Sequence, residues 1–170
     1  MTRTRLVFVA GAAIAAATVA ACSKTPPAEP EVDTAKVVAA VKADVRQLVA
    51  DFNAHDAPKA VSHDAPGMVG MFHGAPNVVG PDADLAQTKQ QMADPLAKVE
   101  VSNETVDVAD SGDLAVYRAT YAFTTTDPHT KKPAVEHGNW LIGYSQQPGG
   151  AWKIIWNVVS DTPAPAPAKG

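Results

Sequence analysis

Hydrophobic residues recur at helical spacing in the first half of the chain and at alternate positions in the second half. Over residues 34–53 they follow an i, i+3, i+4 pattern, which predicts an amphipathic helix with one buried stripe. The members of this stripe are Val37, Val38, Val41, Val45, Leu48, Val49 and Phe52. Asp33 or Thr34 can cap the start of the helix, and residues 53–56 end it.

Two shorter helices and a short strand are expected next. Asp56 can cap a helix over residues 57–63, and a third helix is predicted over residues 82–92. Residues 67–74, which are rich in glycine and bounded by prolines, are predicted to form a short strand and a turn.

From residue 99 onward the period of the hydrophobic pattern changes to two, which is typical of strands with one buried face. Glycine-containing turns at residues 111–112 and 148–150 separate these runs. The four predicted strands cover residues 99–108, 114–126, 135–145 and 152–160. Helices followed by strands indicate an α+β fold, with three N-terminal helices and an antiparallel meander whose curved face holds the first helix.

The first 21 residues have the layout of a secretory signal peptide, in which Arg3 and Arg5 precede an uncharged run of 16 residues, 6–21. That run is shorter than the roughly 20 residues that span a bilayer, so a permanent transmembrane helix is not expected. The sequence Val19-Ala-Ala-Cys22 resembles the bacterial lipoprotein box, although the box prefers leucine where Val19 stands. The resemblance implies that Cys22 becomes the acylated N-terminus; the alternative is an incidental cysteine near an Ala-x-Ala cleavage site.

A polar, proline-containing stretch over residues 22–33 is predicted to be a flexible tether, followed by one domain over residues 34–162. Residues 163–170 repeat proline and alanine and are predicted to form a disordered tail. Ser23 stands where lipoproteins that enteric bacteria keep in the inner membrane carry aspartate. The resemblance therefore implies an exported protein that is lipid-anchored in the outer membrane and faces the periplasm.

Charge and cysteine content exclude several classes of function. Without residues 1–21 the chain has 12 Lys and Arg against 18 Asp and Glu, a formal charge of −6, and no basic stripe, so we expect no nucleic-acid partner. One cysteine excludes an internal disulfide framework and a Cys-rich zinc site. The five histidines form no HExxH or HxH motif, so no metal and no cofactor are expected.

Two motifs carry a resemblance to a known superfamily: the helix junction Phe52-Asn-Ala-His-Asp56 and the final strand Gly150-Ala-Trp-Lys-Ile-Ile-Trp-Asn-Val-Val-Ser160. With the order of helices and strands, they resemble the SnoaL-like and ketosteroid-isomerase-like domains of the nuclear transport factor two superfamily over residues 36–161. The resemblance implies a cone-shaped fold in which a bent sheet wraps the first helix and leaves an apolar pocket open at one end. It also implies a homodimer through the outer face of the sheet.

Catalysis by the isomerase route is not expected, because the family's catalytic groups are missing. The tyrosine of the family falls at Leu48 and the carboxylate base near Phe72, and neither residue can transfer a proton. The nearest titratable substitute is His73, because an ordinary histidine pKa near 6.5 suits a base; the alternative is a turn histidine beside Gly74. The string Ser62-His63-Asp64 has no catalytic meaning, because neighbours on a helix point in different directions.

Aromatic residues pair at i, i+4 on the last three predicted strands, which places the members of each pair on one face. The pairs are Tyr117 with Tyr121, Trp140 with Tyr144, and Trp152 with Trp156. They form one aromatic layer that packs the core, forms a dimer face or lines a ligand pocket. In the last case Asn139 and Asn157 orient the ligand, and the pocket candidates are Tyr117, Tyr121, Asn139, Trp140, Trp156 and Asn157.

The preferred hypothesis is a lipid-anchored, periplasm-facing and non-catalytic domain that binds a small apolar ligand or an envelope protein partner in its pocket. The first alternative is a pocket enzyme, a hydrolase, dehydratase or isomerase, with His73 or another pocket group as its base. The second alternative is a structural or interaction domain whose core is filled. These hypotheses differ in whether a cavity exists, and in whether His73 points into it near a second polar group.

Overall fold

A computed structural model describes residues 32–162 of the chain. The predicted signal peptide over residues 1–21, the lipidation site Cys22, nearly all of the tether and the tail over residues 163–170 lie outside the described residues. Within residues 32–162, no helix combines the length and the apolar character that crossing a membrane requires.

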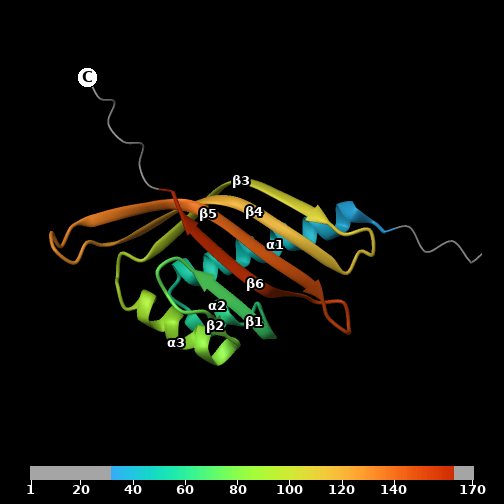
Figure 1. The fold of residues 1–170 in the computed structure, drawn as a ribbon, viewed down its shortest axis with the longest axis horizontal. Coiled ribbons are helices and arrows are strands. Elements are labelled where there is room, and N and C mark those ends of the chain that lie inside the picture. Colours follow the sequence, from blue (N-terminus) through green and yellow to red (C-terminus); the bar gives the residue numbers. More distant parts are fainter. Residues whose placement is uncertain (1–31, 163–170) are drawn as a thin grey trace, which may run out of the picture. The chain divides into compact units, whose positions relative to one another are not determined.

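Three helices and six strands make up the described domain (Figure 1). Asp33 caps the first helix by accepting a hydrogen bond from the backbone N–H of Lys36, and Asp56 caps the second in the same way from Lys59. The second helix ends at Val61, two residues earlier than predicted, so His63 lies in a turn. The elements are α1 (Thr34–Asn53), α2 (Ala57–Val61), β1 (Asp64–Phe72), β2 (Val78–Val79), α3 (Pro81–Met92), β3 (Lys98–Val108), β4 (Leu114–Thr126), β5 (Pro133–Gln146) and β6 (Trp152–Asp161).

The strands form one sheet in the order β2-β1-β6-β5-β4-β3. The predicted meander of four antiparallel strands is confirmed in β3 to β6. The sheet is nevertheless mixed, because β1 pairs in parallel with β6. This pairing brings the chain that follows α2 back beside the last strand, and with it the short strand β2 and the helix α3.

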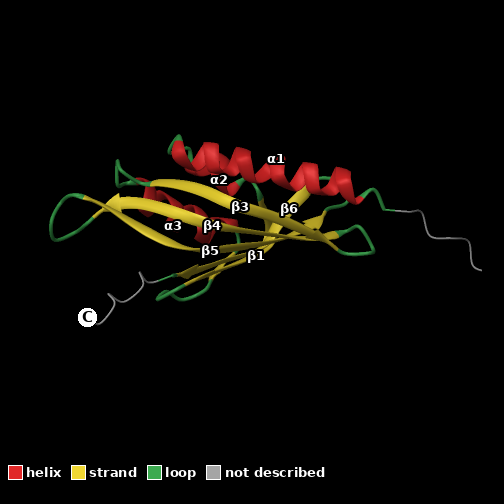
Figure 2. Ribbon diagram, turned by 90° about the horizontal axis from the view of Figure 1, so that it is seen from above, coloured by secondary structure: helices red, strands yellow, loops and turns green. Residues whose placement is uncertain are grey.

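The first helix lies over one face of the sheet and packs against β3, β4 and β6 (Figure 2). Its predicted apolar stripe is buried there, with Val41 and Val45 fully inaccessible to solvent. The face of the sheet that lies against α1 contributes a layer of large side chains to the core. Among the most deeply buried are Tyr117, Tyr144, Ile142 and Ile154. The α+β class and the packing of the first helix on the sheet are therefore as predicted.

A bulge in β6 overturns one prediction about the aromatic layer. Gly143 pairs with Trp156 while the next residue of β5, Tyr144, pairs with Ile154, so Ile155 is an extra residue in the ladder. Because side chains alternate between the two faces of a strand, the extra residue reverses the alternation after Ile154. The expectation that Trp152 and Trp156 share a face is therefore wrong: Trp156 is 41% exposed and lies over Gly143.

Candidate functional site

A cavity of about 340 Å³ lies between α1, α3 and the inner face of the sheet. Its wall is mainly apolar and aromatic, and includes Leu48, Val49, Phe52, Phe123, Trp140 and Ile154. The rings of Phe52 on α1 and Phe123 on β4 meet edge to face, with centroids 6.0 Å apart. The domain over residues 32–162 therefore contains a cavity, which the hypothesis of a filled core does not predict.

Four of the predicted site residues line the cavity: His73, Tyr121, Trp140 and Asn157. The indole N–H of Trp140 donates a hydrogen bond of 2.7 Å to Oδ1 of Asn157, which holds the two side chains together across β5 and β6. Asn157 points inward because of the bulge at Ile155, which also sends Trp156 outward.

The other three pocket candidates lie elsewhere, and each has a physical reason. Tyr117 is fully buried in the core, where its hydroxyl donates a hydrogen bond of 2.8 Å to Glu104 and its ring packs edge to face on Trp140. Asn139 is exposed, because it alternates with Trp140 and so occupies the opposite face of β5. Trp156 is displaced to that outer face by the bulge.

Two carboxyl groups stand in the wall of the cavity, although no prediction assigned them a role there. Asp64 is the first residue of β1, and Asp84 lies in the first turn of α3 with 8% of its surface exposed. Oδ2 of Asp64 is buried and has no hydrogen-bond partner among residues 32–162. Sequence does hold one signal for Asp84, since it shares the buried i, i+4, i+8 stripe of α3 with Thr88 and Met92.

The two acids hold a proton between them. Burial, together with the nearby charge of Asp84, raises the pKa of Asp64 to about 8. Burial also raises the pKa of Asp84, while the hydrogen bond that it shares with Asp64 opposes this increase. Asp64 therefore keeps its proton at neutral pH. We refer to these two residues as the acid pair.

A second polar cluster, made of His73, Glu136 and Tyr121, lies at the open side of the cavity. Oε1 of Glu136 lies 3.1 Å from Nε2 of His73 and also accepts a hydrogen bond from the hydroxyl of Tyr121. The side chains of His73 and Glu136 are 40% and 41% exposed, so solvent reaches both. His73 thus meets the geometric condition set for the enzyme alternative, because it borders the cavity beside further polar groups.

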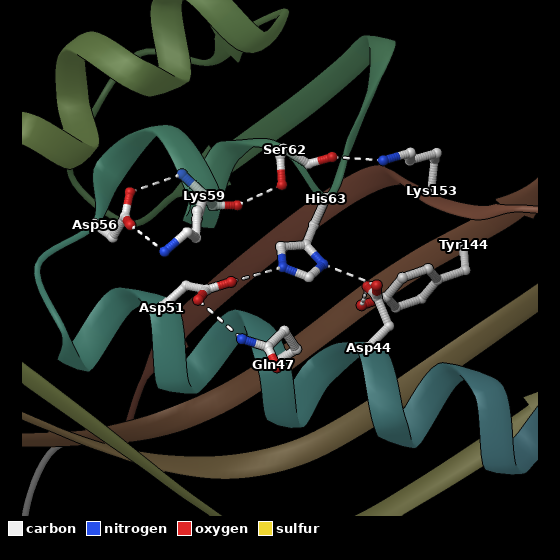
Figure 3. Close-up of polar contacts among 9 residues, drawn as sticks. All are labelled: Asp44, Gln47, Asp51, Asp56, Lys59, Ser62, His63, Tyr144 and Lys153. Atoms are coloured by element: carbon white, nitrogen blue, oxygen red, sulfur yellow. Dashed lines mark hydrogen bonds and ion pairs between the residues drawn. The ribbon is translucent and has the colours of Figure 1, made fainter.

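A separate network surrounds His63, which is buried but does not line the cavity (Figure 3). Nδ1 of its imidazole lies 2.8 Å from Oδ1 of Asp44, and Nε2 lies 3.4 Å from Oδ2 of Asp51. Tyr144 donates to Asp44 at 3.0 Å, and Gln47 donates to Asp51 at 2.9 Å. The hydrogen bond to Asp44 is the main cause of the raised pKa of His63, which favours the doubly protonated imidazolium.

This network fixes structure rather than offering a site. Each ring nitrogen of His63 faces a carboxylate, so the imidazolium is paired on both sides. No three His, Cys, Asp or Glu side chains within residues 32–162 are grouped so as to hold a metal ion.

Comparison with solved structures places this architecture among known folds. A ketosteroid isomerase-like protein from Erwinia carotovora atroseptica is 20% identical, with 75% of this chain and 97% of that chain covered and a TM-score of 0.63. A nuclear transport factor 2 (NTF2-like) superfamily protein from Salmonella enterica Typhimurium is 12% identical, with coverages of 81% and 99% and a TM-score of 0.67. A candidate scytalone dehydratase from Novosphingobium aromaticivorans is 11% identical, with coverages of 76% and 85% and a TM-score of 0.66.

The chain has the NTF2-like fold. No family model and no curated protein matches its sequence. The resemblance drawn from residues 52–56 and 150–160 is confirmed at the level of the fold. Identities of 11–20% extend no further than the fold, so the chemistry of the cavity must be argued from its own residues.

Proposed function

We propose that this NTF2-like domain binds a small, mainly apolar molecule in the cavity between α1, α3 and the sheet. The observation that supports this proposal is the cavity itself. It has a volume of about 340 Å³ and is lined largely by aliphatic and aromatic side chains, with a few polar groups among them. Ligand sites in proteins have about 300–1,000 Å³ and this same composition. An apolar molecule that fills the cavity gains about 25 cal/mol per Å² of apolar surface removed from water.

The test compares two substitutions on β6 that differ only in the face they occupy. Val159 lines the cavity, and its neighbour Val158 faces the other side of the sheet by alternation. We expect native mass spectrometry and a thermal-shift screen with small hydrophobic compounds to detect binding to the wild type and to Val158→Phe. Val159→Phe should lose that binding, because the larger ring fills the cavity. Equal binding by both variants, or none by the wild type, contradicts the proposal.

The setting of this function is the cell envelope. The lipoprotein-like motif at Cys22 supports a domain that is anchored by lipid on the periplasmic side of the outer membrane, where apolar molecules and envelope proteins are at hand. Attachment through Cys22, an envelope protein partner and a homodimer all stay predictions.

A second candidate function is proton-transfer catalysis, and the cluster of His73, Glu136 and Tyr121 favours it. The carboxylate of Glu136 contacts both other side chains at the open side of the cavity, so a base and a hydroxyl donor stand within one hydrogen-bonded group. The superfamily neighbours described as isomerase-like or as a candidate dehydratase make this chemistry a natural alternative.

This alternative has its own test. A ketone that binds in the cavity should exchange its α-hydrogens with deuterium from D₂O, as followed by NMR, and His73→Gln should slow the exchange. His129→Gln, at an exposed position in the loop before β5, is the matched control. Binding of the ketone without exchange above the rate in buffer identifies a binding module.

A further inference from the structure

We propose that the acid pair, Asp64 and Asp84, recognises the ammonium group of an apolar amine bound in the cavity. This inference rests on the proposed binding function and names its ligand class. The two residues come from elements that are separate in the chain, β1 and α3, and both line the cavity.

Burial distinguishes the acid pair from a solvated cluster of acids. Asp84 is more than nine-tenths buried, and no backbone N–H or basic side chain among residues 32–162 lowers the pKa of its carboxyl group. Oδ2 of Asp64 is buried with no partner among the same residues. Buried polar atoms in proteins are nearly always hydrogen-bonded, so the unpartnered Oδ2 of Asp64 indicates that a group from outside residues 32–162 completes the site.

The hydrogen-bond donors and acceptors of the acid pair indicate which chemical group of a ligand could complete the site. An ionised carboxylate only accepts hydrogen bonds, and a protonated one donates a single bond. The two carboxyl groups present four oxygens to the cavity wall and, with Asp64 protonated, one O–H, so the site has acceptors in excess of donors. A ketone or ester brings only further acceptors. An ammonium group brings up to three N–H donors together with the positive charge that a buried carboxylate requires.

No positively charged side chain near the acid pair, among residues 32–162, already forms an ion pair with it, so a ligand cation would not compete with one. Lys153 on β6 and His63 are the positive groups that act on Asp64, and the hydroxyl of Tyr144 on β5 is the other titratable group coupled to it. Lys153 donates its hydrogen bond to the backbone carbonyl of Ser62, and His63 is flanked by the carboxylates of Asp44 and Asp51. Both cations are therefore engaged elsewhere, and neither forms a direct ion pair with Asp64 or Asp84.

Binding of an ammonium group should release the shared proton. The cation favours the fully ionised pair, so Asp64 gives its proton to solvent when the amine binds. Below a pKa of about 8 for Asp64, the affinity for the amine should therefore rise by up to about tenfold per pH unit. The affinity for a neutral ligand with the same hydrocarbon chain should not rise with pH in this way.

The experiment is isothermal titration calorimetry of the purified protein with three probes that share a 4-phenylbutyl chain and differ in the head group: 4-phenylbutylamine, 4-phenylbutan-1-ol and the trimethylammonium analogue. We expect the primary amine to bind at least about tenfold more tightly than the alcohol at pH 7.5, a difference of about 1.4 kcal/mol. Its heat of binding should depend on the ionisation enthalpy of the buffer, since up to one proton is released. The trimethylammonium probe carries the charge without N–H donors and should bind less tightly than the amine.

Asparagine variants test the residues while keeping the side-chain volume. Asp64→Asn and Asp84→Asn should each remove the preference for the amine and its pH dependence but leave the affinity for the alcohol within about twofold. Asp82→Asn, at an exposed position in the same turn of α3, is the matched control and should behave as the wild type. Circular dichroism of each variant establishes that the fold is kept.

Each contrary outcome has a distinct meaning. Equal affinity for amine and alcohol, unchanged in the asparagine variants, overturns the amine site and leaves the proposed binding function standing. Binding of the trimethylammonium probe as tightly as the amine overturns the donor argument and hence the proposal. Binding of none of the three probes, with no other apolar ligand found in the thermal-shift screen, overturns the proposed function as well.

Discussion

His63 and Asp44 are joined by a 2.8 Å contact that fixes the turn after α2 to the middle of α1. The same carboxylate accepts a hydrogen bond of 3.0 Å from Tyr144 on β5, so one side chain of α1 holds both the turn and the sheet (Figure 3). Asp51, about two helical turns further along α1, approaches the other ring nitrogen of His63. The position of β1, and therefore of Asp64 beside the cavity, depends on this network.

The His63 network predicts a loss of stability as the pH rises. The pKa of His63 is raised in the folded chain, mainly by Asp44, above the unfolded value of about 6.5. Its contribution is therefore fully present below that unfolded value and is lost as the pH rises through the folded pKa. At pH 6, His63→Gln should cost about 3 kcal/mol of unfolding free energy, because it leaves a buried carboxylate without its cation.

Urea unfolding of the wild type and His63→Gln at several pH values between 5.5 and 9 measures this effect. The two stability curves should converge with increasing pH, whereas His129→Gln, at an exposed position in the loop before β5, should follow the wild type throughout. Parallel curves for the wild type and His63→Gln would show that His63 is neutral in the folded chain.

The acid pair also lowers stability with increasing pH, for a different reason. Asp64 keeps its proton in the folded chain up to a pKa of about 8, whereas the unfolded chain loses it near 3.9. Between these values the folded state binds more protons, so its stability falls as the pH rises through that window. Asp64→Asn removes the buried charge and can still donate to Asp84, so it should be more stable than the wild type by about 2 kcal/mol at pH 9.

Thermal unfolding at pH 5 and pH 9 tests this expectation, with Asp82→Asn as the exposed control. A difference between Asp64→Asn and the wild type that stays constant across this range would mean that Asp64 is ionised throughout.

Much of the fold could be predicted from local sequence patterns, because the residues that determine helix caps and hairpin turns lie close together in the chain. The caps at Asp33 and Asp56 act three residues away, and the turns of the meander join strands that are neighbours in sequence. The parallel pairing of β1 with β6 joins residues 87 to 90 positions apart in the chain, and no local pattern specifies it. The bulge at Ile155 belongs to the same class, since it depends on the two strands that flank β6.

The site could be predicted only in part for the same reason. Alternation along β4 and β5 correctly placed Tyr121 and Trp140 on the inner face, where they line the cavity. The acid pair is formed by two elements, β1 and α3, that are separate in the chain, and no local pattern around Asp64 brings it to Asp84. A charged residue on the buried stripe of α3 was the available signal for Asp84, because such a position is costly unless a partner or a function compensates.

If the protein is lipid-anchored, acyl chains should be attached at Cys22 and at no other residue, and metabolic labelling with a fatty acid should detect them. In cells supplied with labelled palmitate, the wild type should incorporate the label and Cys22→Ala should not, because the thioether and the acylated amine both form at Cys22. Ser23→Ala changes the neighbouring residue and should keep the label. Label that persists in Cys22→Ala, or fails to enter the wild type, excludes the lipoprotein prediction.

Two glycines predict opposite responses to the same substitution. A Cβ added at Gly138 on β5 would meet the backbone oxygen of Ser160 on β6, and would lie 2.5 and 2.6 Å from ring and hydroxyl atoms of Tyr121. The backbone of β6 cannot move away without loss of the β5–β6 pairing, so overpacking is the expected result. Gly138→Ala should therefore lower the unfolding free energy by about 2 kcal/mol and weaken ligand binding by displacing Tyr121 from the cavity wall.

Gly67 on β1 provides the control, because a Cβ there would meet no atom within 4 Å. Gly67→Ala should be neutral, or should stabilise the protein by up to about 1 kcal/mol by restricting the unfolded chain. Chemical denaturation of both variants, together with a thermal-shift titration of a cavity ligand, separates the two expectations. If Gly138→Ala unfolds at the wild-type midpoint and keeps its affinity for the ligand, then Tyr121 does not depend on the close approach of β5 and β6 for its place in the cavity.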